Sequence, residues 1–198
     1  RFLFVQQRKF EAALVAGVKS LSDLTERLVL PRREPQLRLI SLEDERVRRE
    51  AFKTLLPLYS LQAAAGYFGN GEAVEPEAWI ETEGIGQLDE QMFVARAVGR
   101  SMEPRIYDGD FLVFRSQPVG SRQGKIVLIQ YHDLADPETG GSYAVKRYRS
   151  EKFFSAEEGW RHTKITLEPL NMEFQSIVIK PEKEEIVKVI AEYVCTLG

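Results

Sequence analysis

The sequence has very few of the residues that would support several common functions. One cysteine, Cys195, occurs among 198 residues, so no internal disulfide forms and we expect a reducing, cytoplasmic compartment. The two histidines, His132 and His162, are not spaced like metal ligands, and we expect neither a metal nor a cofactor. No apolar run approaches the roughly 18 residues that a membrane-spanning helix needs, so we expect no membrane contact.

Positive charge is scarce over most of the chain. The net charge is −3, from 27 Lys and Arg against 30 Asp and Glu. Residues 1–56 hold 12 basic and 8 acidic residues, whereas residues 57–198 hold 15 and 22. A phosphate-neutralising surface is therefore not expected on residues 57–198. The excess of positive charge over residues 1–56 is too small to favour direct DNA binding by this chain.

The pattern of apolar and turn residues changes near residue 57. Apolar residues recur close to a 3.6-residue period over 3–30 and predict helix, and Ser41 as an N-cap predicts another helix near 42–55. Beyond this point, short β-branched and aromatic runs alternate with turn residues. They predict strands at 92–99, 110–116, 125–132, 143–150, 164–169, 176–180 and 185–194. We therefore predict a mainly β domain over 57–198, preceded by a helical segment or linker over 1–56.

The strongest local pattern surrounds Ser101, in the string VGRSMEPRIYDGD at 98–110. Gly99 would let the backbone approach a bound peptide closely. The N–H groups of Arg100 and Ser101 would then face a developing oxyanion. Taken alone, the pattern is better interpreted as an ordinary serine in a β-turn. The rest of the motif ends in a tight turn and comprises Met102, Pro104, Asp108, Gly109 and Asp110.

A lysine in a later strand supplies a partner for this serine. Strand alternation over YAVKRY at 143–148 places Lys146 on one face and Arg147 on the other, so one basic residue faces inward. Burial favours the neutral form of a lysine, and a neutral amine is the base that a serine nucleophile needs. The alternative is a lysine on an edge strand whose ammonium reaches solvent.

Taken together, these strings resemble the family of LexA, UmuD and phage-repressor self-cleaving peptidases. GRSMEPRIYDGD resembles the family's nucleophile motif, and YAVKRY its lysine strand. LEPLNMEFQSIVI resembles the segment that follows, and VIAEYVCTLG the last strand, so the resemblance covers about 55–198 in the right order. It implies a twisted β-fold, Ser101 as nucleophile and Lys146 as general base. It also implies a homodimer, and a RecA–single-stranded DNA filament as the trigger of an SOS-type DNA-damage response.

The family cuts its own chain at an Ala-Gly or Cys-Gly bond upstream of the serine. LPLYSLQAAAG at 56–66 matches this pattern, so the resemblance implies Ala65–Gly66 as the scissile bond, 35 residues before Ser101. A flexible linker is the alternative interpretation. Ala63 stands where the family often has a larger apolar residue, and the spacing from Ser101 to Lys146 is longer than usual. The excess is expected in a hairpin loop at 133–142.

The predicted function is that of a serine autopeptidase whose single turnover is a regulatory switch. The alternative is a dimerisation or regulatory module, with slow proteolysis, in a larger nucleic-acid-handling protein or transcriptional repressor. Because 3–30 shows no tri-helical DNA-binding pattern, we expect the chain to be the C-terminal part of a longer protein. The segment at 186–195 is apolar on both faces and predicts a dimer contact through the C-terminal strands.

Overall fold

The computed structural model describes residues 37–71, 73–132, 136, 141–155, 159–180 and 187–197, with the side chains of 152–162 left out. These residues belong to one compact unit, Gln36–Gly198. The helix predicted over 3–30 lies outside the described residues, as does most of the loop predicted at 133–142. None of the helices in the described ranges has the length and hydropathy to cross a membrane.

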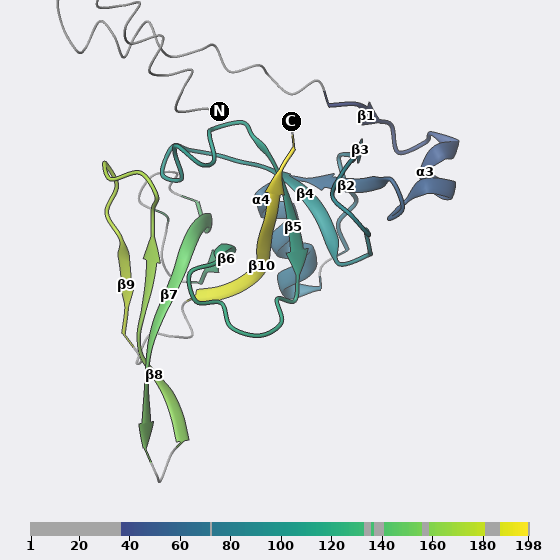
Figure 1. The fold of residues 1–198 in the computed structure, drawn as a ribbon. Helices are drawn as coiled ribbons and strands as arrows, with labels where there is room; N and C mark the ends of the chain where they lie inside the picture. The colour runs from purple at the N-terminus through teal and green to yellow at the C-terminus, as the bar shows by residue number, and fades with distance from the viewer. Residues whose placement is uncertain are drawn as a thin grey trace, which may run out of the picture. The chain divides into compact units, whose positions relative to one another are not determined.

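The described residues form one sheet with the strand order β1-β3-β2-β4-β5-β10-β6-β7-β8-β9 (Figure 1). All neighbouring strands are antiparallel except β2 and β4, which are parallel. The predicted mainly β fold is therefore confirmed. The strands are β1 (Leu39–Ile40), β2 (Leu55–Tyr59), β3 (Ala78–Glu81), β4 (Met92–Arg96), β5 (Phe111–Ser116), β6 (Ile126–Tyr131), β7 (Tyr143–Ser155), β8 (Gly159–Glu168), β9 (Ile177–Ile179) and β10 (Val187–Thr196).

Helix α3 (Glu45–Glu50) is shorter than the helix predicted near 42–55. The predicted N-cap, Ser41, is wrong. The carboxylate of Asp44 accepts a hydrogen bond from the Arg46 N–H at 2.8 Å, so Asp44 caps the helix instead. The chain then reverses into β2, which shortens the helix at its C-terminal end.

A second helical stretch follows β2, and it contains the predicted scissile bond. Helix α4 (Leu61–Ala65) continues into the π-helix η1 (Gly66–Asn70). The Ser60 hydroxyl caps α4 by accepting the Ala63 N–H at 3.1 Å, and the three alanines that follow have the highest helix propensity.

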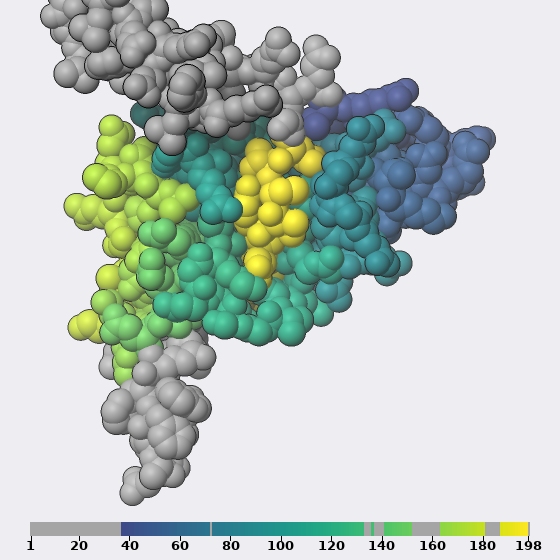
Figure 2. Space-filling view, viewed as in Figure 1, coloured from purple at the N-terminus to yellow at the C-terminus, as the bar shows by residue number. Residues whose placement is uncertain are grey.

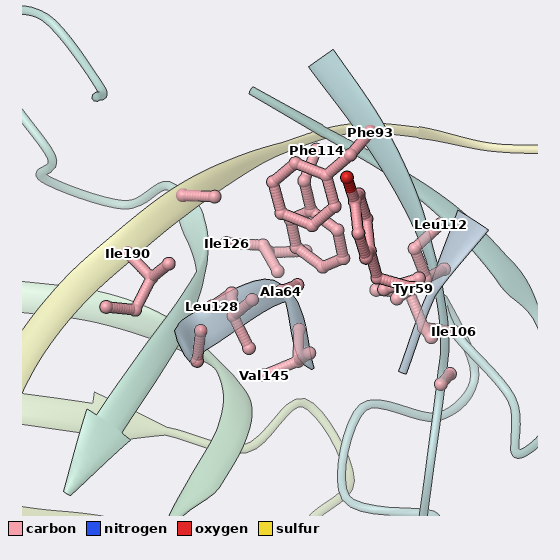
Figure 3. Packing of buried hydrophobic residues seen from close by; sticks show 14 of the residues in the cluster. Tyr59, Ala64, Phe93, Ile106, Leu112, Phe114, Ile126, Leu128, Val145 and Ile190 are labelled. Carbon is pink, nitrogen blue, oxygen red and sulfur yellow. The ribbon is translucent and has the colours of Figure 1, made fainter. Parts of the chain in front are cut away.

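Helix α4 packs into the main hydrophobic core. Figure 3 shows Ala64 among buried side chains contributed by β4, β5, β6 and β7. Phe68 of η1 stacks on Phe93 with ring centroids 4.4 Å apart, and Lys188 of β10 donates a hydrogen bond to the Gly69 carbonyl. The stretch 61–70 is therefore anchored in its middle and near its C-terminal end.

Strand β10 lies inside the sheet, hydrogen-bonded to β5 on one side and β6 on the other. One of its faces packs Ile190 and Tyr193 into the main core. In Figure 2 the other face of this yellow strand reaches the surface. Val194 is 42% exposed there, so any partner of β10 meets a face of the strand rather than an edge.

Candidate active site

The turn between β4 and β5 holds Ser101 in a fixed conformation. Gly99 has φ 89°, a value that favours glycine, and its N–H is bound by the Asp108 carboxylate at 2.8 Å. The Asp110 carboxylate accepts a hydrogen bond from the Tyr107 N–H at 2.8 Å. These bonds close the loop on itself, so Ser101 projects from a turn that its own motif stabilises.

The other motif residues serve the same turn. Met102, the residue after the nucleophile, is buried in the main core and anchors the turn there. Gly109 has φ 83°, and its N–H donates to the Ala97 carbonyl at 3.0 Å. Pro104 follows Glu103 through a cis peptide bond. The predicted tight turn at 108–110 is therefore present.

Lys146 of β7 is the inward-facing member of the basic pair. Lys146 and Ser101 are each 4% exposed as whole residues, and the Lys146 Nζ donates to the Ser101 Oγ at 2.7 Å. Arg147 lies on the opposite face, where it and Arg149 bind Glu168 at 2.8 Å. Burial opposes ionisation of the Glu168 carboxyl, but the two arginine hydrogen bonds outweigh it and lower its pKa. The structure thus brings Ser101 and Lys146 together across 45 residues.

A third residue, which is charged and was not indicated by any sequence motif, lies next to this pair. The Asp136 carboxylate is 1% exposed, and its Oδ2 lies 3.3 Å from the Lys146 Nζ. The Asp136 N–H donates to the Gly141 carbonyl at 2.8 Å, which fixes the residue beside β7. An opposite charge this close favours the ammonium form of a lysine, whereas burial alone favours the amine.

The peptide plane that carries the Ser101 N–H is also held in place. Its carbonyl, that of Arg100, accepts hydrogen bonds from the Asn171 Nδ2 at 3.2 Å and from the Glu103 N–H at 3.1 Å. Because a peptide unit is planar, these bonds orient the Ser101 N–H as well. Asn171 is the second residue beside Ser101 that no sequence motif indicated.

Replacing Asn171 by alanine is expected to slow reactions at Ser101 by about tenfold, since one hydrogen bond that orients an oxyanion donor is lost. The fold is expected to persist, because the Leu170 and Asn171 N–H groups still bind the Ser101 carbonyl. The labelling rate of Ser101 by a fluorophosphonate measures the effect. Met172→Ala, which removes a neighbouring side chain that is 97% exposed, is the matched control and should react normally.

Two cavities meet at the serine and the lysine. One of about 270 Å³ has mostly apolar walls and includes the first residues of α4, Leu61 and Gln62. The other, of about 310 Å³, lies toward 173–177. Ser101, Lys146 and Asp136 line both, so a peptide has space on either side of the serine hydroxyl.

The predicted cleavage site is not extended in this conformation. Ala65 ends α4, Gly66 begins η1, and both residues are buried. Neither is among the residues that line the two cavities around Ser101, although Leu61 and Gln62 of the same helix are. The bond therefore has to leave the helix before a serine can attack it.

Among the residues that the structure describes, the other reactive side chains do not form a second site. Burial raises the pKa of the Cys195 thiol, which makes it a poor nucleophile. Within the part of the chain that the structure describes, no three His, Cys, Asp or Glu side chains gather where they would hold a metal ion.

Comparison with known proteins gives one finding. A family model described as Peptidase S24-like matches residues 57–194. No curated protein matches the chain. The matched range contains Ser101, Lys146, Asp136 and the Ala65–Gly66 bond.

Proposed function

The chain belongs to the Peptidase S24-like family, and from that premise we propose that it cuts its own backbone between Ala65 and Gly66. Ser101 is the nucleophile and Lys146 the general base. The observation that carries the proposal is the 2.7 Å contact between the Lys146 Nζ and the Ser101 Oγ in a buried site. A lysine held this close to a serine hydroxyl is placed to take its proton.

The proposed chemistry balances at each step. Neutral Lys146 takes the Ser101 hydroxyl proton as Oγ bonds to the Ala65 carbonyl carbon, and the Arg100 and Ser101 N–H groups stabilise the oxyanion. The ammonium then protonates the Gly66 nitrogen as the peptide bond breaks. Lys146 then takes a proton from water as the hydroxide attacks the acyl-enzyme carbonyl, and the ammonium returns that proton to the Ser101 Oγ as the ester bond breaks. Ala65 is released as a carboxylic acid, which loses its proton to solvent.

The helical conformation of 61–70 supports a switch between two states. A docked state, with Ala65 and Gly66 buried in helix, is protected, and an extended state brings the bond to Ser101. A trigger acts by binding the extended state more tightly. Following the family resemblance, we propose a RecA–single-stranded DNA filament as that trigger and a DNA-damage response as the setting.

Loosening the docked state is expected to speed self-cleavage. Phe68→Ala removes a ring that stacks on Phe93 at 4.4 Å and meets Tyr59 edge-on at 6.0 Å. Losing about 1.4 kcal/mol of docking free energy raises the extended population roughly tenfold, so we expect about tenfold faster cutting. Gel quantification over time measures it. Phe111→Ala, which removes a similar ring from a different core cluster, is the control and should leave the rate unchanged.

A second candidate function has one observation in its favour. The Ala65–Gly66 bond is buried in a helix, as expected if the domain is a regulatory or dimerisation module that rarely cuts. Incubation with a fluorophosphonate separates the two functions. A single adduct on Ser101, mapped by peptide mass spectrometry, supports the peptidase, whereas a chain that stays unlabelled up to alkaline pH supports the module.

We also propose that the domain forms a two-fold symmetric dimer through the open face of β10. Val194 is the exposed apolar residue of that strand, so Val194→Asp is expected to give monomers without disturbing the core. Sedimentation velocity of the parent and the variant at tens of micromolar measures this. A parent chain that sediments as a monomer ends the dimer proposal.

A further inference from the structure

Two opposite charges are buried together beside the serine. Among the described residues, the buried charged side chains are Asp110, Asp136 and Lys146. Asp110 is engaged with the backbone of its own turn, through the Tyr107 N–H. Asp136 and Lys146 lie 3.3 Å apart with 1% and 5% of their side chains exposed. An isolated buried ion is strongly unfavourable, so each of these charges stabilises the other.

The groups that face this pair do not replace Asp136. Tyr131 of β6 is buried, and its pKa is raised by burial and by the nearby Asp136 charge, so it is neutral. Tyr143 lines the first cavity, and its hydroxyl meets Gln130. Glu173 lines the second cavity but is 71% exposed and lies 4.0 Å from Arg100. In the described part of the chain, Asp136 therefore provides the buried negative charge at Lys146.

We propose that Asp136 is a positioning residue that holds Lys146 as an ammonium ion in the resting site and sets the pH at which Ser101 becomes reactive. The proposal rests on the proposed function, because it concerns the base of the same reaction. An ammonium ion donates to the serine hydroxyl and does not take its proton, so the paired site is inactive. Once Lys146 is neutral and has accepted the Ser101 proton, the same carboxylate stabilises the ammonium that forms.

These two effects change the reactivity of Ser101 in opposite directions, so the Asp136→Asn variant is expected to have a characteristic dependence of that reactivity on pH. Without the carboxylate, more of Lys146 is neutral at a given pH, and the midpoint of Ser101 reactivity moves to lower pH by about one unit or more. At the alkaline plateau the variant is slower, by roughly tenfold, because the newly formed ammonium has lost its counter-charge. The two pH profiles therefore cross. A purely structural role for Asp136 lowers reactivity at every pH and leaves the midpoint in place.

The experiment measures fluorophosphonate labelling of Ser101 in the full chain as a function of pH, for the parent, Asp136→Asn and Asp89→Asn. Asp89 pairs with Arg115 at the surface, so its loss should leave the profile unchanged. Crossing profiles support the proposal. An unchanged midpoint in Asp136→Asn, with or without loss of rate, overturns it.

A second measurement needs no activity. In Ser101→Ala protein, the chemical shift of the Lys146 ε-carbon reports its protonation from neutral to alkaline pH. We expect the transition at lower pH when Asp136→Asn is added, and coincident transitions overturn the proposal. If the parent Ser101 never reacts with the fluorophosphonate, the proposed peptidase function fails, and this titration alone decides the role of Asp136.

Discussion

Replacing Ser101 or Lys146 by alanine is expected to reduce self-cleavage at least a thousandfold, because each residue supplies an atom that the proposed reaction requires. Ser101 provides the oxygen that bonds to the substrate carbon, and Lys146 provides the nitrogen 2.7 Å away that takes its proton. Time courses resolved by gel and mass spectrometry measure the loss. A Lys146→Ala chain that cuts at the parental rate would show that another group is the base.

The two variants should differ in stability. Ser101→Ala removes a small polar group, whereas Lys146→Ala removes the positive charge that lies 3.3 Å from the buried Asp136 carboxylate. Breaking a buried pair in this way costs about 3–5 kcal/mol. Adding Asp136→Asn to Lys146→Ala is expected to restore most of that stability in urea unfolding, while activity stays absent. This double variant shows that the loss of cutting is chemical and not due to unfolding.

Alkaline pH is expected to drive self-cleavage without a trigger, with the rate rising roughly tenfold per pH unit while Lys146 is still mostly protonated. The reason is that the fraction of neutral amine grows tenfold for each unit of pH below the midpoint of its titration. The rate of fragment formation between neutral and alkaline pH measures the slope. A rate that is flat with pH contradicts a lysine base.

Two buried tyrosines limit the useful pH range. Burial raises the pKa of Tyr59 to about 12, and burial also raises the pKa of Tyr131. The stability that comes from keeping these tyrosines neutral is fully present below the pKa of an unfolded tyrosine, about 10, and is lost as the pH rises beyond it. Cutting is therefore best measured below about pH 10, where the fold is not weakened by these groups.

The sequence predicted the strands whose patterns depend on local composition. The run at 126–129 is continuous and apolar, as a strand buried on both faces requires, and β4, β5, β7 and β10 were predicted from other runs rich in β-branched and aromatic residues. The first three strands were not predicted. Strand β1 has two residues, and β2 contains Pro57, which ordinarily argues against a central strand. Here the pairing of β2 with β4 begins only at Leu58, so the proline is tolerated.

The site was predictable where it lies within motifs, and not where it depends on tertiary structure. Ser101 and Lys146 stand in strings with a recognisable spacing. Asp136 lies among Asp, Pro and Gly residues that equally suit a solvated turn, and no sequence pattern indicates that its carboxylate lies 3.3 Å from the Lys146 Nζ. Asn171 lies within a string that the family resemblance covers, but its hydrogen bond to the Arg100 carbonyl spans 71 residues. The helix over 61–70 follows from Ser60, which caps it, and from the three alanines that come after. The same small residues also suit a flexible linker, so the sequence alone did not predict the helix.

The most direct test of the account is the identity of the fragments that the purified chain yields after prolonged incubation at about pH 9.5, below the tyrosine range. Intact-mass spectrometry is predicted to find two products whose new ends are Ala65 and Gly66, and neither product in Ser101→Ala treated identically. Fragments with other ends, fragments that also form in Ser101→Ala, or a parent chain that stays intact would contradict self-cleavage by Ser101 and Lys146.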